Sequence, residues 1–376
     1  MSLAIAGMGW ITPLGNGVDA VWEQLLQGYE ATAEKMSEQF SNRPYNAFRV
    51  PESALGRLAP HPRLRRASVI SRFAAAAGLQ ALQAAGVKVE PQNAERMALI
   101  FAISNGGVIY TKRFYRDIVE AGARSASPLL FPETVFNAPA SHLAAILGIT
   151  GATYTQVGDS AVGLLAIRMA EDLMANEELE YCLVVGAEEV DWLLCDAYRR
   201  WRLLRLAPPV EPFNKTARGM ILSEGAGAIL LSRKGPIMIA QTDAGAHYRK
   251  RTETEEIVSQ TISNLAQTEV DFVISSANGT FIDQAECRAL RRIIPDAIVY
   301  TAKPAVGESV GAAGVWQVIL GAQALGRGEL PPLLHVTSTI PLRVPASRTA
   351  LTKARHAIVL SCGVNQQVAG LRLSIP

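Results

Sequence analysis

The stretch from Thr153 to Arg168 constrains the fold of this chain most strongly. It opens with the β-prone residues Thr153, Tyr154 and Val157, turns sharply through Gly158, and continues as an apolar helix. This order predicts a strand, a tight turn and a buried helix, with Ser160 at the helix N-terminus, where unpaired amides and the helix dipole favour an anion or a thiolate. Enzymes of acyl transfer place Ser or Cys at such an elbow. A simpler interpretation is that Asp159 or Ser160 only caps the helix.

Strands and helices alternate along the rest of the chain, while residues 29–66 predict an irregular excursion. Alternation of this kind favours α/β layers with mostly parallel sheets. At 376 residues the chain exceeds one typical core, and its second part repeats the pattern of the first. We therefore expect two halves, residues 1–235 and 236–376, packed as one body. The predicted strands are 3–7, 97–104, 153–157, 181–186, 224–231, 237–244, 271–275, 297–301, 357–362 and 368–373, and the predicted helices include 18–27, 68–85, 140–147, 253–267, 281–293 and 310–325.

Composition excludes several classes of function. Apolar residues make up 49% and charged residues 19% of the chain, and a net charge of +2 gives no reason to expect nucleic acid or an acidic membrane surface. The sequence shows no basic leader and no long uncharged apolar run, which predicts a cytoplasmic protein. The four cysteines lack metal-ligand spacing and are expected to be buried free thiols. The sequence contains no dinucleotide-binding or phosphate-loop pattern. We therefore predict no metal and no cofactor.

Motifs spread over almost the whole chain resemble those of the β-ketoacyl-acyl-carrier-protein synthases. They occur in the order of that family, at residues 5–15, 21–28, 136–144, 147–152, 212–218, 223–228, 276–286 and 303–314. The resemblance implies a thiolase-type duplicated αβαβα sandwich. It also implies a dimer built through the strand that leads into the elbow.

The departures from the family pattern bear on function. The resemblance places Ser160 where the family has its Cys nucleophile, Asn278 at the first catalytic His and Glu308 at the second, while Lys303 is kept. The glycine-rich gate near the C-terminus is replaced by Gly363-Val-Asn-Gln366. A serine hydroxyl needs a base to react, and an ionised Glu308 would repel the enolate that develops during decarboxylation. No self-sufficient condensation is therefore expected.

A catalytic alternative remains open. Ser160, with Glu308 as base and Asn278 as oxyanion donor, would make an acyltransferase or thioesterase acting on carrier-bound acyl chains. Glu308 beside Lys303 could instead form a plain ion pair. The five histidines offer no replacement base, because none occupies a family catalytic position; they are His61, His142, His247, His335 and His356.

A preserved scaffold with a replaced triad resembles the chain-length factors of type II polyketide synthases. Such subunits pair with an active ketosynthase as a heterodimer and shape the tunnel for a growing polyketide, polyene or fatty-acid-like chain. The expected partner is thus an active ketosynthase, with an acyl carrier protein as a further candidate. By this analogy residues 107–119 and 128–137 close the tunnel, through Val108, Thr111, Phe114, Tyr115, Phe131 and Phe136. The alternative is that Tyr110 and Phe114 form one core stripe.

A basic run follows Trp192. It contains Arg199, Arg200 and Arg202, with Arg205 close behind. Such a run is typical of a solvated helix face. A second hypothesis is that it docks an acidic carrier protein or the partner subunit.

Overall fold

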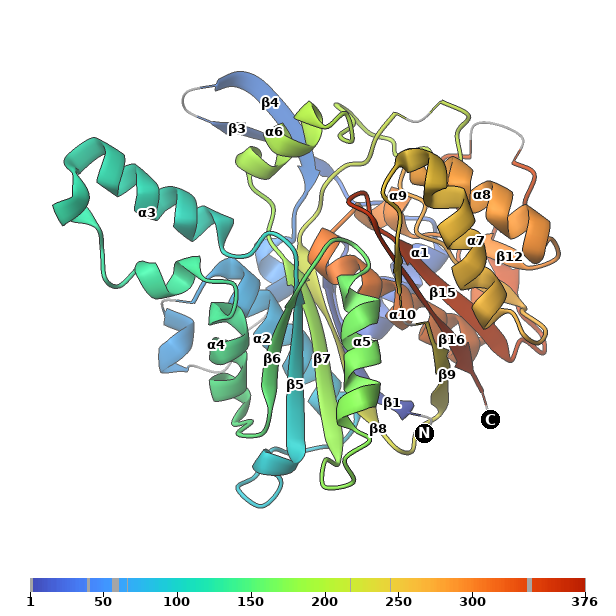
Figure 1. Ribbon diagram of the computed structural model, residues 1–376, viewed down its shortest axis with the longest axis horizontal. Coiled ribbons are helices and arrows are strands. Elements are labelled where there is room, and N and C mark those ends of the chain that lie inside the picture. The colour runs from blue at the N-terminus through green and yellow to red at the C-terminus, as the bar shows by residue number, and fades with distance from the viewer. Residues whose placement is uncertain are drawn as a thin grey trace.

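One large mixed sheet runs through the molecule (Figure 1). The computed structural model describes residues 3–38, 41–55, 61–65, 67–216, 218–243, 245–336 and 340–375. The strand order along the sheet is β12-β11-β15-β16-β9-β1-β8-β7-β5-β6. These strands are β1 (Leu3–Thr12), β5 (Met97–Ile103), β6 (Thr153–Val157), β7 (Tyr181–Glu188), β8 (Gly225–Ser232), β9 (Ile237–Thr242), β11 (Phe272–Ile274), β12 (Ile298–Tyr300), β15 (His356–Cys362) and β16 (Gln367–Ser374).

The pairing pattern of the sheet occurs twice. In the first set, β1, β8 and β7 pair antiparallel in that order, and β7, β5 and β6 then pair parallel. In the second set, β9, β16 and β15 pair antiparallel, and β15, β11 and β12 pair parallel. The antiparallel pair β1–β9 joins the two sets into one sheet. The internal repetition seen in the sequence is therefore a repetition of strand order and strand direction.

The helices form three layers around the two sets of strands. Helices α2 (Val69–Ala84) and α4 (Ala138–Leu147) cover one face of the first set, and α7 (Thr254–Leu265) and α8 (Ile282–Ile293) cover the second set. Between them lie α5 (Val162–Leu173) and α10 (Val310–Arg327). The layer order α-β-α-β-α agrees with the predicted sandwich.

Glycines allow the central helices to touch. A Cβ atom on Gly163 of α5 would lie 2.7 Å from the backbone nitrogen of Val315 in α10, and one on Gly314 of α10 would lie 3.0 Å from that of Leu164. Such contacts are possible only without a side chain. The close crossing fixes the start of α5, and with it Ser160, against the start of α10.

Two predictions about the fold were wrong. The sheet is mixed rather than mostly parallel, because β1, β8, β9 and β16 pair with their neighbours antiparallel. The excursion 29–66 contains a hairpin, β3 (Ala33–Glu38) and β4 (Ser41–Phe48), although residues 39–40, 56–60 and 66 lie outside the described part. Strand β3 and the first half of β4 are polar and accessible, so their sequences lack the apolar alternation that marks a strand.

The remaining helices lie around the sheet. They are α1 (Val18–Leu26), α3 (Val108–Ala121), α6 (Trp192–Arg200) and α9 (Lys303–Val306), and the short minor strands are β2 (Gly15–Asn16), β10 (Ala246–His247), β13 (Glu329–Leu330) and β14 (Thr349–Ala350). All four cysteines are buried and unpaired, as predicted. Within the described ranges, no helix has the length and apolar character needed to cross a membrane.

Candidate functional site

Ser160 lies at the predicted elbow. Strand β6 pairs parallel with β5 and ends at Val157, and α5 begins at Val162. The turn between them brings Ser160 to the carboxyl edge of the sheet, where its side chain is only 1% exposed. The capping interpretation is not supported, since the N-cap residue of α5 is Ala161 and no side chain caps that helix.

Glu308 connects the four residues that the sequence pointed to. Its Oε1 accepts a hydrogen bond from Ser160 Oγ at 3.1 Å. Its Oε2 accepts from Asn278 Nδ2 at 2.8 Å and from Lys303 Nζ at 2.6 Å. The side chains of Ser160, Asn278, Lys303 and Glu308 are thus brought together in a buried cluster.

Further hydrogen bonds hold Asn278, Lys303 and Glu308 in place. Asn278 follows β11, and its Oδ1 accepts from the Thr280 hydroxyl at 2.7 Å. Lys303 begins α9, just after β12, and its Nζ also donates to the Ser276 carbonyl at 3.0 Å. Glu308 precedes α10, and its backbone amide donates to the Ile221 carbonyl at 2.9 Å. The second set of strands therefore places three side chains opposite the elbow of the first set.

Two further buried carboxyls support the Asn278 segment. Asp283 accepts the backbone amides of Asn278 and Gly279, and burial raises the pKa of Asp283 to about 6. Glu286 accepts the amide and hydroxyl of Ser276, and burial raises its pKa to about 7. These contacts are structural: they fix the loop after β11 and leave both carboxyls pointing at backbone amides.

The hydrogen bonds of the cluster limit its chemistry. Stabilising an oxyanion requires donors aimed at the position where negative charge develops. The side-chain donors beside Ser160, Asn278 Nδ2 and Lys303 Nζ, are both directed at the Glu308 carboxylate. Among the described residues, Ser160 forms hydrogen bonds with the side chains of Glu308 and Ser361 and with no imidazole. None of the described His, Cys, Asp and Glu side chains form a group that could hold a metal. The side chains of the cluster form an internal ion-pair and hydrogen-bond network.

A cavity of about 720 Å³ opens next to this cluster. It is lined from the first set of strands by Asn105 and Asp159, from α6 by Tyr198, and from the β15–β16 turn by Asn365 and Gln367. Ser160 does not belong to the described residues that line it. Asp159 and Gln367 were missed as site residues by the sequence analysis, where Asp159 entered only as a cap.

Glu188 lies beneath the start of α10 and was also missed. Its Oε2 accepts the backbone amides of Ser104, Asn105 and Gly311, and its Oε1 has no hydrogen-bond partner among the described residues. Burial raises the pKa of this carboxyl to about 8. In the sequence, only the consecutive acidic residues at the end of β7 indicated that Glu188 could belong to the site.

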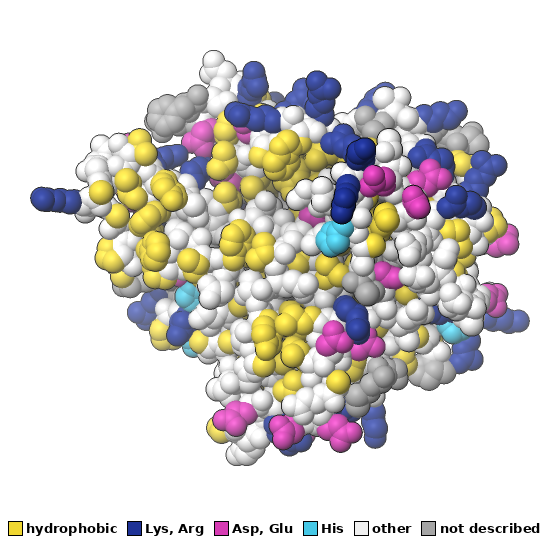
Figure 2. Space-filling model, in the orientation of Figure 1, with side chains coloured by type: hydrophobic (Ala, Val, Ile, Leu, Met, Phe, Trp, Pro, Cys, Tyr) yellow, Lys and Arg dark blue, Asp and Glu magenta, His cyan; other side chains and the backbone are white. Residues whose placement is uncertain are grey.

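The predicted tunnel residues lie on an arm that projects from the body (Figure 1). None of the residues of α3 is fully buried, which argues against the core-stripe interpretation of Tyr110 and Phe114. The Phe114 ring packs against Phe131 of the short helix Phe131–Thr134, with ring centroids 5.8 Å apart. Tyr115 is 61% exposed, and Val108, Thr111 and Phe136 are also accessible. Apolar side chains gather on this arm in Figure 2.

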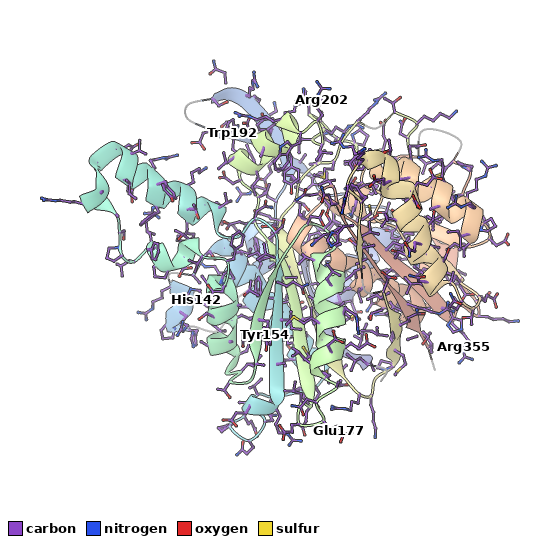
Figure 3. All side chains as sticks on the ribbon, viewed as in Figure 1. His142, Tyr154, Glu177, Trp192, Arg202 and Arg355 are labelled. Atoms are coloured by element: carbon purple, nitrogen blue, oxygen red, sulfur yellow. The ribbon has the colours of Figure 1, made fainter. Side chains whose placement is uncertain are left out.

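The edge strand β6 is a second accessible surface. It ends the sheet and pairs only with β5 among the described strands. Tyr154 and Val157 expose 43% and 49% of their area along it. Figure 3 shows Tyr154 on this strand, and His142 on the adjoining helix α4. His142 Nε2 lies 2.6 Å from Glu133 Oε1, so this histidine holds the Phe131–Thr134 helix to α4.

The basic run lies at the end of α6, and Figure 3 labels Arg202 at the top of the molecule. Arg200 pairs with Asp196 one turn earlier at 2.8 Å, and its side chain is mostly exposed. Arg205 is largely buried and pairs with Glu211 at 2.9 Å. Arg199, Arg200 and Arg202 are therefore exposed to a partner, whereas Arg205 has an internal role.

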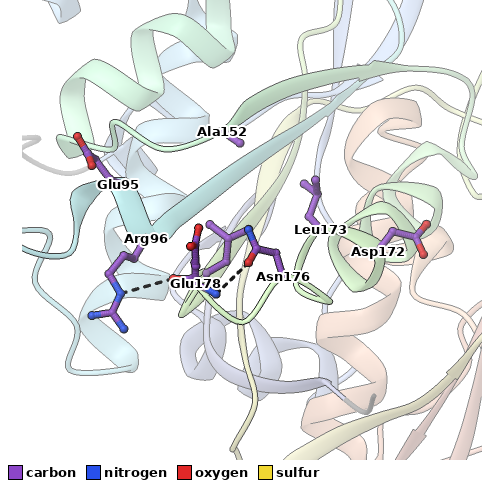
Figure 4. Close-up of a pocket in the computed structure, with 8 residues that line it drawn as sticks. Glu95, Arg96, Ala152, Asp172, Leu173, Asn176 and Glu178 are labelled. Atoms are coloured by element: carbon purple, nitrogen blue, oxygen red, sulfur yellow. Dashed lines mark hydrogen bonds between the residues drawn. The ribbon is translucent and has the colours of Figure 1, made fainter.

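A second cavity, of about 790 Å³, lies at the opposite ends of β5 and β7 (Figure 4). Glu95, Arg96, Asp172 and Glu178 line it, and Arg96 Nε donates to the Glu178 carbonyl. The residues of the Glu308 cluster lie at the other end of these strands and do not reach it.

Comparison with known proteins agrees with this architecture. The family models "Beta-ketoacyl synthase, N-terminal domain" and "Beta-ketoacyl synthase, C-terminal domain" match residues 2–236 and 240–337. A protein of Vibrio harveyi named 3-oxoacyl-[acyl-carrier-protein] synthase 2 is 24% identical over 369 residues, covering 89% of this chain and 88% of its own length. Nodulation protein E of Rhizobium leguminosarum bv. trifolii is 24% identical over 366 residues, covering 90% of each.

Solved structures share the whole fold. The ishigamide ketosynthase/chain length factor superposes with a TM-score of 0.88 at 21% identity, covering 100% of this chain and 99% of the other. The structure of the ketosynthase ApeO in complex with its chain length factor ApeC, from Xenorhabdus doucetiae, gives a TM-score of 0.83 at 18% identity, with 100% and 98% covered.

Proposed function

Because this chain belongs to the β-ketoacyl synthase family, we propose that it is a non-catalytic subunit that pairs with an active ketosynthase and shapes the tunnel for the growing acyl chain. It would serve polyketide, polyene or fatty-acid-like synthesis, in the manner of a chain-length factor. The two halves suggested by the sequence, 1–235 and 236–376, would act as one rigid body in this pair.

The Glu308 cluster is the observation that carries the proposal. Condensation needs a nucleophile and neutral donors around a thioester carbonyl. At the positions that the family resemblance assigns to them, Ser160 donates to a carboxylate, and Asn278 donates to the same carboxylate. By the family resemblance, the Glu308 side chain would then face the enolate that condensation forms, which disfavours that step. The relative from Vibrio harveyi is named a 3-oxoacyl-[acyl-carrier-protein] synthase, and under this proposal the Glu308 cluster sets the present chain apart from such an enzyme.

The surface supports pairing with a second subunit. An unpaired sheet edge with exposed Tyr154 and Val157 can add strands from another chain. The projecting arm presents Tyr115, Val119 and Phe131, and contiguous exposed apolar side chains of this kind mark interaction sites. Two of the structural neighbours are themselves described as ketosynthase and chain length factor together. We propose an acyl carrier protein as a further partner, which would bind at the basic end of α6.

One observation favours a second function. The hydrogen bond from Ser160 Oγ to Glu308 is a serine–carboxylate pair, which a carrier-directed acyltransferase or thioesterase could use. Against it stand the burial of Ser160 and the engagement of both neighbouring donors by Glu308. Covalent acylation of Ser160 would be its signature.

Co-expression with an active ketosynthase from the same organism tests the pairing. Native mass spectrometry is expected to give a one-to-one complex, and Val157→Asp on the free edge should disrupt it. The matched control is Val336→Asp, which changes another exposed valine away from this edge. A chain that forms only homodimers, or a complex insensitive to Val157→Asp, would contradict the proposed interface.

A further inference from the structure

The projecting arm makes little apolar contact with the body. Figure 1 shows α3 extending away from the sheet, with the hairpin β3–β4 and α6 above it. Among the described elements, α3 packs mainly against the two short helices that follow it, Ala123–Ser125 and Phe131–Thr134, and none of its side chains is fully buried. Because a helix gains most of its stability from apolar packing, the direction of α3 depends on its polar contacts.

Lys112 makes the central polar contact of the arm. Its Nζ donates to Glu38 Oε2 of the hairpin at 3.0 Å and to Asp191 Oδ2, at the start of α6, at 2.7 Å. The three side chains are 25%, 19% and 11% exposed for Lys112, Glu38 and Asp191. Partial burial alone would lower the pKa of Lys112, but its hydrogen bonds to Asp191 and Glu38 outweigh burial and raise that pKa. Both carboxylates therefore stabilise the charged form of Lys112.

Arg116 bonds to the same glutamate one turn further along the helix. Residues four positions apart lie on one face of a helix, so Lys112 and Arg116 point to the same side of α3. Arg116 Nη2 donates to Glu38 Oε1 at 3.3 Å, and each oxygen of Glu38 thus accepts from one cation of the arm. We call Glu38, Lys112, Arg116 and Asp191 the arm brace.

The brace joins the arm to two elements that are fixed to each other. Asp191 Oδ1 accepts the Leu193 amide at 2.9 Å and so caps α6, while its Oδ2 accepts from Lys112. Tyr45 Oη of β4 donates to Asp196 Oδ1 of α6 at 2.8 Å, in a buried contact. The hairpin and α6 therefore form one unit, and Lys112 bonds to both of its parts.

We propose that Lys112 is a positioning residue for the face of the arm that closes the tunnel: through the arm brace, the hairpin β3–β4 and α6 hold α3 in the direction that sets product length. The consequence for product length rests on the proposed function, whereas the attachment of the arm is a property of the isolated chain. The inference gives the polar hairpin a role in chain-length control.

Hydrogen exchange of backbone amides, followed by mass spectrometry on the full isolated chain, tests the attachment. Lys112→Met keeps the helix propensity and an unbranched side chain but removes the charge. Exchange in peptides from residues 108–121 is expected to rise roughly threefold to tenfold, because both ion pairs of Lys112 are lost. Glu38→Met, a change outside the arm, should raise exchange in the same peptides.

Arg113→Met is the matched control. Arg113 is exposed on the same helix and takes part in none of the three ion pairs of the brace, so its loss removes an equal charge and should leave exchange at the native rate. Lys112→Arg keeps the charge and should restore protection. Should Lys112→Met not fold, Arg116→Met removes the other cation from Glu38 and should loosen α3 by a smaller factor. Equal exchange of α3 in Lys112→Met and Arg113→Met, or a rise matched in peptides of β5, would overturn the brace.

Product lengths from the pair with an active ketosynthase test the positioning role. Lys112→Met should broaden the distribution, because an arm that moves presents no fixed wall, whereas Arg113→Met and Lys112→Arg should reproduce the native distribution. A native distribution from a Lys112→Met pair in which α3 exchanges faster would overturn the positioning role. A native chain that gives no productive pair would instead refute the proposed function, and the exchange comparison would still decide whether the brace holds the arm.

Discussion

Lys303 Nζ lies 2.6 Å from Glu308 Oε2, and both side chains are almost completely buried. An ion pair removed from water is costly to break from one side, because the remaining charge loses its compensation. The pair also fixes Glu308 so that its other oxygen faces Ser160. It therefore maintains the geometry that distinguishes this site.

We predict that Lys303→Met lowers the free energy of unfolding by about 3–5 kcal/mol. The double variant Lys303→Met with Glu308→Leu should lose less than the single variant, since no unpaired charge remains. Urea unfolding monitored by circular dichroism measures both. Arg288→Met, which breaks the exposed pair with Glu255, is the control and should cost less than about 1 kcal/mol. A double variant less stable than Lys303→Met would show that the ion pair does not govern this cluster.

Glu188 makes stability depend on pH. Its pKa is about 8 in the folded chain against an ordinary value of 4.5, because of burial. Between these values the folded state holds a proton that the unfolded state has lost, so the contribution of Glu188 is full below about pH 4.5 and falls as pH rises towards 8. The carbonyl oxygen of a glutamine at this position could accept the same backbone amides without titrating.

Glu188→Gln should therefore become more stable relative to the native chain as pH rises from 5 to 8, by roughly 1–4 kcal/mol. Chemical unfolding at several pH values gives this difference directly. Glu253→Gln serves as the comparison, because Glu253 is exposed and its pKa is lowered by backbone amides. A pH-independent difference between Glu188→Gln and the native chain would count against proton retention by this carboxyl.

Tyr115 is predicted to limit product length in the reconstituted pair. Its ring meets Phe114 edge-on with centroids 5.9 Å apart, and it adds bulk to the exposed face of the arm. Tyr115→Ala should give longer products, because a packed wall tolerates little extra volume and a smaller side chain frees space. Mass spectrometry of the products measures the shift. Tyr29→Ala removes an exposed tyrosine elsewhere and should leave the distribution unchanged; the same shift in both variants would refute the assignment.

The basic end of α6 offers a binding test. Reversing both Arg200 and Arg202 to Glu should weaken binding of an acidic acyl carrier protein several-fold, most clearly at low salt, because exposed charges steer such encounters. Arg355→Glu is the control, since Figure 3 places Arg355 at the other end of the molecule from Arg202. Titration calorimetry of the pair with the carrier protein gives the affinities. Unchanged binding would mean that the run is an ordinary solvated helix face.

The sequence was informative where local pattern and motif agree. The strand, turn and helix around Ser160 were predicted because β-branched residues, a glycine and an apolar helix follow one another within sixteen positions. The contacts of Lys303 and Glu308 were anticipated as an ion pair from their short separation. The direction of the strands could not be predicted in the same way, because a buried strand such as β8 has the same composition whether its neighbours run parallel or antiparallel.

Other features depend on contacts between distant segments. Asp159 of the elbow and Asn365 of the segment that replaces the gate are 206 positions apart, and no local pattern in the sequence indicates that they form a hydrogen bond. The hairpin β3–β4 was missed because its polar strands are stabilised by each other and by Lys112 of α3, which contacts Glu38. Tertiary interactions of this kind leave no periodic signal in the sequence.

Condensation assays with acyl- and malonyl-carrier protein test the central claim most directly. Three samples are compared: the isolated chain, the pair with its ketosynthase, and the pair in which this chain carries Ser160→Ala. We predict no product and no acylated Ser160 with the isolated chain, and equal rates for the two pairs. Condensation by the isolated chain at an enzyme-like rate, or loss of activity in the Ser160→Ala pair, would contradict a subunit that contributes shape and contact surface while its partner supplies the chemistry.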